Sequence, residues 1–186
     1  MRAAVMHEPA AGAGDGASRP ATITPLPLRA ALGRFPTGVT LIVTECADHR
    51  VHAMTVNSFT SLSLDPPLVL WALRASSARF ATFAHCKRVS VNVLAEHQVE
   101  LARACARPGD PGVPTASWDA FLAGCPVVGE ASAQFVCEPR DVAHYGDHAV
   151  VVAEVTAFVE SARKPLVFVG GRYYAGSSLM AAQGAG

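Results

Sequence analysis

The first regular pattern of hydrophobic positions lies in the segment LPLRAALGRF. Leu28, Leu32 and Phe35 recur there at helical spacing before a proline and a glycine interrupt the pattern. This spacing predicts a short amphipathic helix that leads into a turn. Residues 1–25 are rich in Ala, Gly, Pro and Ser and carry almost no large apolar side chain, so we expect a disordered N-terminal arm.

The next three segments have the pattern of strands. The β-branched run VTLIVTEC (39–46) and the segment VHAMTVNSF (51–59) are separated by four polar residues, which predicts a β-hairpin. The run LVLWALR (68–74) is too short for a confident helix and is rich in residues that suit a buried strand. We expect it to join the same sheet.

In the rest of the chain, segments with helical spacing of the hydrophobic residues alternate with strand-like runs. Helical spacing predicts helices at 77–86 and 96–107, and strand-like runs occur at 88–95 and at about 132–139, 148–159 and 165–170. An irregular loop is expected from residue 108 to 117. Six or seven strands, mostly joined by tight turns, and two or three peripheral helices favour a mainly β fold. We predict a closed or partly closed antiparallel barrel rather than a doubly wound parallel sheet.

Composition narrows the class of protein. The 186 residues are 51% hydrophobic, which is enough apolar material for one compact domain. Lys and Arg number 15, as do Asp and Glu, so the basic surface of a general nucleic-acid binder is not expected. Five cysteines occur without a C-x-x-C pair, which favours reduced thiols in the cytoplasm over a zinc site. No apolar run approaches the roughly 20 residues that span a bilayer, so we expect a soluble protein without membrane contact.

The polar stretch TVNSFTS (55–61) allows two interpretations. Ser, Thr and Asn are ordinary loop residues, so a solvent-exposed loop explains the stretch. A surface of neutral donors and acceptors for a flat polar ligand explains it as well.

A candidate phosphate-binding segment is RASSARF (74–80). Ser76 and Ser77 offer hydroxyl groups, the following helix offers free N–H groups, and Arg79 lies in its first turn, with Lys87 and Arg88 further along. In the alternative interpretation a serine only caps the helix and the cations are solvated. No G-x-G-x-x-G motif is present, so a nucleotide would be bound by other means than in a Rossmann domain.

The tripeptide GDH (146–148) places His148 at the start of a predicted strand, where functional residues often occur, although a single histidine there is more often structural. His144 lies four residues earlier, but a turn between the two argues against a shared helix face. We therefore predict no metal site. Tyr173 follows the last predicted strand and is a candidate to cover a ligand.

Taken together, several motifs resemble those of the flavin reductase family. They are FPTGVTLIVT (35–44), AMTVNSFTSLSLDPPLVL (53–70), SARF (77–80), RVSVNVLA (88–95), the GCPVV turn (124–128), GDHAVVVAEV (146–155) and PLVFVGGRYY (165–174). More narrowly, the chain resembles the small NAD(P)H:flavin oxidoreductase component of two-component flavin-dependent monooxygenases. The resemblance covers roughly residues 28–175.

This resemblance implies a split β-barrel of the FMN-binding type over residues 26–178, a flexible tail at 179–186 and a homodimer. It also implies reduction of FAD or FMN by NADH or NADPH, with FAD and NADH favoured, through direct hydride transfer from nicotinamide C4 to flavin N5. The reduced flavin would then diffuse to a separate monooxygenase. The alternatives are a flavoprotein that retains its flavin and a flavin-binding module without catalysis.

The resemblance also assigns residues. The flavin would contact Thr37, Gly38, Thr55, Val56, Asn57, Ser58 and Ser61, and its phosphate would contact Ser76, Ser77, Ala78, Arg79 and Arg88. His148, as the catalytic residue, and Tyr173 would place the nicotinamide.

Overall fold

The computed structural model describes residues 22–46, 49–107 and 120–180. Within them the helices are α1 (Pro25–Leu32), α2 (Phe80–Ala84), α3 (Val99–Ala106) and α4 (Gly176–Met180). The strands are β1 (Thr37–Gly38), β2 (Thr40–Glu45), β3 (Val51–Val56), β4 (Thr60–Leu64), β5 (Pro67–Arg74), β6 (Val89–Val93), β7 (Ala120–Leu122), β8 (Cys125–Val127), β9 (Ala133–Tyr145), β10 (His148–Glu160), β11 (Leu166–Val169) and β12 (Arg172–Ala175). The mainly β expectation is confirmed.

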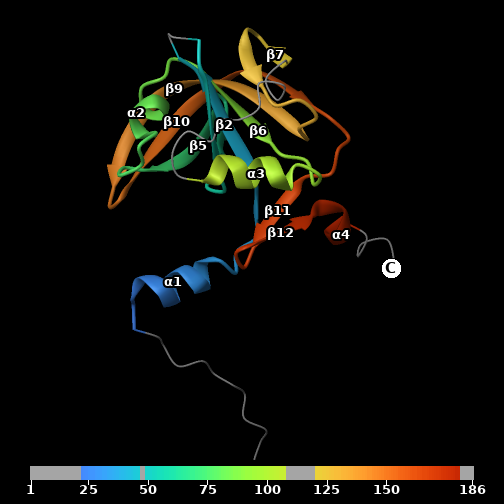
Figure 1. Ribbon diagram of the computed structural model, residues 1–186. Coiled ribbons are helices and arrows are strands. Elements are labelled where there is room, and N and C mark those ends of the chain that lie inside the picture. The colour runs from blue at the N-terminus through green and yellow to red at the C-terminus, as the bar shows by residue number, and fades with distance from the viewer. Residues whose placement is uncertain (1–21, 47–48, 108–119, 181–186) are drawn as a thin grey trace, which may run out of the picture.

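The body of the molecule is a seven-stranded antiparallel sheet in the order β3-β2-β6-β9-β10-β5-β4 (Figure 1). The predicted hairpin of β2 and β3 is confirmed, with Thr40 opposite Val56 and Glu45 opposite Val51. The long strands β9 and β10 form the centre of the sheet. In the part of the chain that the structure describes, no strand pairing joins β3 to β4, so the sheet remains open and a closed barrel is not observed.

Both faces of the sheet are covered at β2, where residues 40–44 are all buried, so this strand reads as a nearly continuous apolar run. Ile42 of β2 faces one hydrophobic cluster, which contains Trp71 and is covered by Phe83 of α2. Its neighbour Leu41 faces a second cluster, which is covered by α3 through Ala102 and other residues. Successive side chains of a strand point to opposite faces, so a single strand supplies both clusters.

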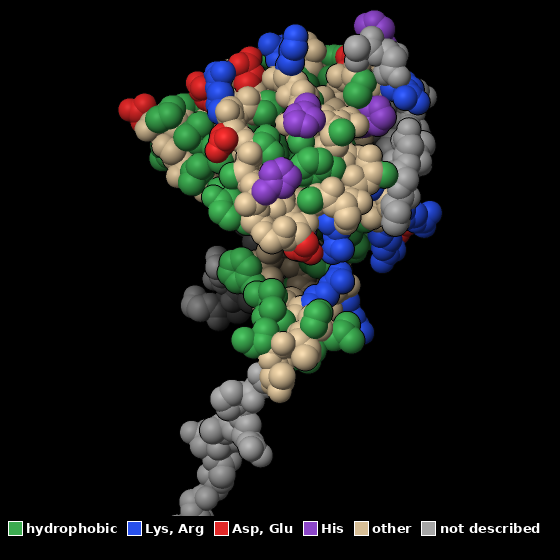
Figure 2. Space-filling view, turned by 90° about the vertical axis from the view of Figure 1, so that its left-hand side faces the viewer, with side chains coloured by type: hydrophobic (Ala, Val, Ile, Leu, Met, Phe, Trp, Pro, Cys, Tyr) green, Lys and Arg blue, Asp and Glu red, His purple; other side chains and the backbone are tan. Residues whose placement is uncertain are grey.

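A smaller sheet of β1, β11 and β12 lies between the body and α1 (Figure 1). Helix α1 forms as predicted but buries none of its side chains. Leu26 and Leu32 are exposed, as is Phe35 just beyond the helix. Figure 2 shows hydrophobic side chains on this projecting part and Lys and Arg side chains near its junction with the body. From here on, the arm means residues 22–35 of the structure. It overlaps the N-terminal arm predicted from the sequence, residues 1–25, only at residues 22–25.

The remaining differences from the expected elements concern short segments. The strand β4 was not predicted, because its residues are mostly exposed and polar at the edge of the sheet. The helix expected at 77–86 is shorter, and the described chain enters α4 at Gly176, which was not expected. The predicted loop at 108–117 and most of the predicted arm lie outside the described residues.

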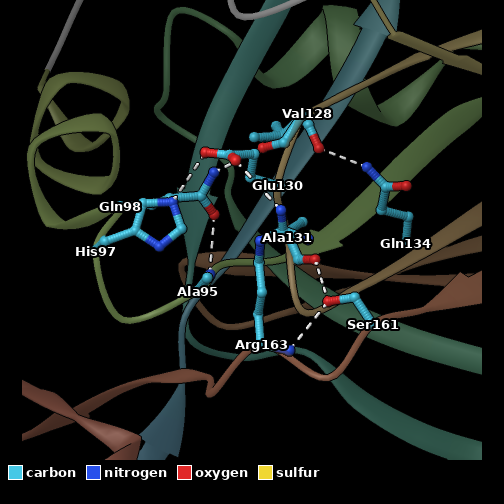
Figure 3. A network of polar contacts seen from close by, with 10 residues as sticks. Ala95, His97, Gln98, Val128, Glu130, Ala131, Gln134, Ser161 and Arg163 are labelled. Atoms are coloured by element: carbon cyan, nitrogen blue, oxygen red, sulfur yellow. Dashed lines mark hydrogen bonds and ion pairs between the residues drawn. The ribbon is translucent and has the colours of Figure 1, made fainter.

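A polar network fixes the turn between β8 and β9 at the N-terminal end of α3 (Figure 3). Gln98 accepts a hydrogen bond from the Ala95 amide at 2.9 Å and donates one to the Gly129 carbonyl at 2.8 Å. Glu130, which has a positive φ of 61°, lies 3.2 Å from Arg163. These contacts satisfy backbone groups that no strand or helix pairs.

Candidate functional site

Two neighbouring clefts bring most of the predicted site residues together. The strand cleft, with a volume of about 780 Å³, lies beside residues 54–58, 72–74 and 76–79. The arm cleft, with a volume of about 1050 Å³, lies between the arm and the body. Both clefts are lined by the same four residues, which we call the junction: Arg29, Asn57, Arg74 and His148. Volumes of several hundred Å³ are typical of sites for small molecules.

The hydroxyl groups beside the strand cleft are engaged within the protein. Thr55 Oγ1 donates to the Ala102 carbonyl of α3 at 2.7 Å. Ser58 Oγ accepts from the Ala72 amide at 3.0 Å and lies 3.3 Å from the Ala72 carbonyl. Asn57, between them, is exposed, and its side chain has no protein partner among the described residues. The side chain of Asn57 is therefore free to contact a ligand.

Arg79 is also engaged within the protein. Its guanidinium donates to the carbonyls of Ala53 at 2.7 Å, Cys105 at 3.1 Å and Arg107 at 2.5 Å. The last two carbonyls lie at the C-terminal end of α3, where helical carbonyls lack partners in the helix. Arg79 thus ties α3 to β3, and three of the five N–H donors of its guanidinium are engaged in the fold. Its contact with a phosphate stays a prediction.

The neighbouring serines have different surroundings. Ser77 Oγ accepts a hydrogen bond from the Arg79 amide at 3.3 Å, but the N-cap residue of α2 is Arg79 and no side chain caps this helix, so the capping interpretation is wrong. Ser76 and Ala78 are exposed and line the strand cleft. Helix α2 begins only at Phe80 and has five residues, so its N-terminus offers little to an anion.

His148 opens β10 at the junction. In the sheet it lies opposite Arg74 of β5. Its Nδ1 lies 2.7 Å from Asp147 Oδ1, and this hydrogen bond lowers the pKa of the Asp147 carboxyl. With Nδ1 held by Asp147, the Nε2 atom is the one available to a ligand.

Thr37 lines the arm cleft, and its Oγ1 atom is buried without a hydrogen-bond partner. A buried hydroxyl without a partner is unfavourable unless a ligand or water satisfies it. The adjacent Gly38 has open space where a side chain would lie. Val56 is buried at the end of β3 and contributes to the wall of the strand cleft.

Besides Gly38, three predicted site residues line neither cleft. Arg88 is 3.2 Å from the Ala123 carbonyl and 3.7 Å from Glu138, and it lines a separate pocket. Tyr173 packs against Phe168 at 5.2 Å between ring centroids, beneath Arg103, and burial raises the pKa of its hydroxyl. Ser61 is exposed in the edge strand β4. The structure does not bring these three residues to the junction.

Sequence reasoning missed Arg29 and Arg74. Arg74 begins the RASSARF segment and lies opposite His148, so pairing the GDH strand with β5 would have found it. No sequence signal placed Arg29 of α1 beside it.

The described residues contain no group of three or more His, Cys, Asp or Glu side chains arranged to hold a metal. All five cysteines are free thiols. Burial raises the pKa of Cys86, Cys105 and Cys125 to about 11 and that of Cys137 to about 12, so these thiols are poor nucleophiles. None of the helices that the structure describes has the length and apolar content needed to cross a bilayer.

The donor set suits a flavin nucleotide. Neutral groups, namely the Asn57 amide, the Ser76 hydroxyl and the unpaired Thr37 Oγ1, match the polar edge of an isoalloxazine ring and a ribityl chain. Two exposed arginines at the junction match phosphate.

Comparison with known proteins also points to a flavin-binding protein. The flavin reductase like domain matches residues 32–177. A probable flavin reductase of Rhizobium meliloti is 37% identical over 81% of this chain and 48% of its own length. The FMN reductase (NADH) SmoA of Agrobacterium fabrum is 37% identical over 78% of this chain and 82% of its own length.

A solved structure is similar as well. The NADH:FAD oxidoreductase SgcE6 of Streptomyces globisporus, in complex with NAD and FAD fragments, has a TM-score of 0.73 and 32% identity, covering 79% of this chain and 89% of that chain. The chain spans between 47% and 66% of the length of the first three curated relatives that it matches.

Proposed function

The chain belongs to the flavin reductase family, and from this we propose that it reduces FAD or FMN with NADH and releases the reduced flavin to a separate monooxygenase. Several relatives support the assignment by their names. SmoA is an NADH-dependent FMN reductase, and the HsaB protein of Rhodococcus jostii is the reductase subunit of a flavin-dependent monooxygenase. The single structural observation that carries the proposal is the junction, where His148 and Asn57 line both clefts.

In this reaction a hydride passes from the reduced nicotinamide to the flavin ring, and no acid or base from the protein is required for that transfer. The residues of the chain bind and orient the two nucleotides. We assign the flavin to the strand cleft, with Asn57 donating to the polar edge of its ring, and the nicotinamide to the His148 side of the junction. Uncharged donors suit this edge, because it gains electron density on reduction and a carboxylate would oppose that change.

The proposed flavin contacts differ in kind. Asn57 and Ser76 act through side chains, whereas Thr55, Val56, Ser58, Ser77 and Ala78 act by shaping the cleft. Thr37 and Gly38 approach from β1. Arg79 acts through the fold, and Arg88, Tyr173 and Ser61 are not part of the proposed contact set.

We further propose that residues 26–178 form the flavin reductase domain as a split β-barrel that acts as a cytoplasmic homodimer. The match over residues 32–177 supports this extent. The exposed apolar side chains of the arm support the dimer, because Leu26, Leu32 and Phe35 are not covered by other described residues of the same chain.

The test is NADH oxidation by the purified protein, followed by absorbance, with FAD and FMN added separately. We expect a colourless protein that oxidises NADH only when flavin is added. Protein that stays yellow through gel filtration and reduces another acceptor would instead indicate a flavoprotein that retains its flavin. Flavin binding without NADH oxidation would indicate a binding module.

A further inference from the structure

Four arginines line the two clefts, and the structure separates them by use. Arg79 lines the strand cleft but donates to three backbone carbonyls. Arg34 lines the arm cleft but not the strand cleft. Only Arg29 and Arg74 line both clefts. The cations that a ligand extending through the junction would meet are therefore Arg29 and Arg74.

Arg74 is available for such a ligand. It is the last residue of β5 and is exposed, directly opposite His148. Its guanidinium has no hydrogen bond or ion pair with another described residue. The nearby Asp147 carboxylate feels its charge, yet that carboxylate already holds His148 Nδ1 at 2.7 Å.

Arg29 reaches the junction from the arm. It belongs to α1, which has no buried side chain, and it lines both the arm cleft and the strand cleft. Like Arg74 it is exposed, and its guanidinium has no partner among the described residues. The arm thus brings a second free guanidinium to a cleft that already contains one.

Two exposed guanidinium groups line the same clefts, and an anion bound between them would offset the repulsion of their like charges. The neighbouring groups Ser76 and Asn57 are neutral donors, which add hydrogen bonds to an anion without opposing its charge. Guanidinium groups bind phosphate oxygens in a bidentate geometry that few other anions match as well.

We propose that Arg29 and Arg74 together bind a phosphate group of a nucleotide at the junction of the two clefts. This inference rests on the proposed function and assigns to it two residues that were not predicted from the sequence. The phosphate can come from the flavin nucleotide in the strand cleft or from the pyrophosphate of the nicotinamide nucleotide in the arm cleft. The chemistry of recognition is the same for both sources.

The first arm of the experiment compares riboflavin with FMN, since the two differ only by the phosphate. Binding is measured by flavin fluorescence, without turnover, for the wild type, Arg29→Gln, Arg74→Gln and Arg74→Lys. If the flavin supplies the phosphate, each Gln variant binds FMN about tenfold more weakly, because a charge-assisted hydrogen bond is lost. Riboflavin affinity changes less than twofold. Arg74→Lys falls between wild type and Arg74→Gln, since lysine keeps the charge but not the bidentate geometry.

The second arm compares NADH with reduced nicotinamide riboside, which lacks phosphate, by binding titration of the same proteins. If the nicotinamide nucleotide supplies the phosphate, the Gln variants lose about tenfold in NADH affinity and keep their affinity for the riboside. Arg163→Gln is the control for a lost positive charge, because Arg163 lies in the polar network of Figure 3, outside both clefts. Thermal unfolding of each variant shows that it is folded.

The outcomes separate the inference from the proposed function. Equal losses for phosphorylated and unphosphorylated ligands, or losses matched by Arg163→Gln, overturn the inference while the proposed function stands. Suppose that the wild type binds FMN about tenfold more tightly than Arg74→Gln does but never oxidises NADH. This result overturns the proposed function and supports the inference. Wild-type protein that binds neither nucleotide overturns both.

Discussion

The two sides of the candidate site use their polar side chains in opposite ways. Beside β3 and α3, Thr55 and Arg79 direct their donors to backbone carbonyls, at 2.7 Å from Ala102 and 2.7 Å from Ala53. At the junction with the arm, Asn57 and Arg74 are exposed and have no such contacts. Residues of the same chemical types therefore hold the site together on one side and are free for ligands on the other.

The difference shows how to sort candidate residues. A donor that satisfies a backbone carbonyl must break that bond to reach a ligand, and it leaves behind an unsatisfied group. A donor that faces solvent gives up only water. Chemical type and position in a motif do not distinguish these cases, whereas hydrogen-bond partners do. Three substitutions and one titration test the comparison, from the largest expected effect to the smallest.

Arg79→Ala should cost about 2–3 kcal/mol of unfolding free energy, because three carbonyls on α3 and β3 lose their donor. Urea denaturation measures the loss. Arg163→Ala is the matched control, since its exposed ion pair with Glu130 is worth under about 1 kcal/mol. A variant with wild-type stability and lost FMN affinity would place Arg79 on the ligand side of the comparison.

His148→Ala should raise the KM for NADH about tenfold, equivalent to about 1.4 kcal/mol, and leave FMN affinity within twofold. The reason is that Nε2 of His148 is the free ring atom at the junction. Asn57→Ala serves as the contrasting variant and should weaken FMN binding more than it changes the KM for NADH. Similar losses for both nucleotides in both variants would show that the two residues do not divide the ligands.

Thr55→Val should cost about 1 kcal/mol of unfolding free energy and leave FMN affinity within twofold, because its hydroxyl donates to the Ala102 carbonyl. Chemical denaturation and flavin fluorescence give the two quantities. Thr55→Ser restores the donor and should recover most of the stability. Weaker FMN binding at unchanged stability would mean that the hydroxyl turns to the flavin.

The Asp147 carboxyl should titrate below its usual pKa of 3.8, since its hydrogen bond from His148 favours the charged form. A lowered folded-state pKa contributes stability above the unfolded value, and this contribution is lost as the pH falls through the folded value, below about 4. Carbon NMR of the carboxyl group measures the titration. In His148→Ala the pKa should rise toward 3.8, and an unchanged value would mean that the contact does not form in solution.

Local pattern predicted the parts of this molecule that depend on neighbouring residues. The hairpin of β2 and β3, the strand β5 and helix α3 follow from the alternation or helical spacing of their own side chains. Edge strand β4 escaped prediction because it is short and polar at three of its five positions, so it was taken for part of a polar loop. The segments that form the strand cleft, 54–58 and 76–79, were also found from the sequence, because the motifs that resemble the flavin reductase family lie within them.

What the tertiary structure decided is how each of those residues is used. Arg79 and Arg74 belong to one heptapeptide, yet α3, which lies more than 20 residues away, supplies carbonyls to Arg79 and none to Arg74. Arg29 approaches the cleft only because α1 lines the arm cleft together with His148, the first residue of β10. Periodicity reports which face of an element is buried, whereas hydrogen-bond partners come from residues that are distant in sequence. The sequence therefore predicted the segments that line the candidate site, and the packing of distant elements decided which of their donors are free.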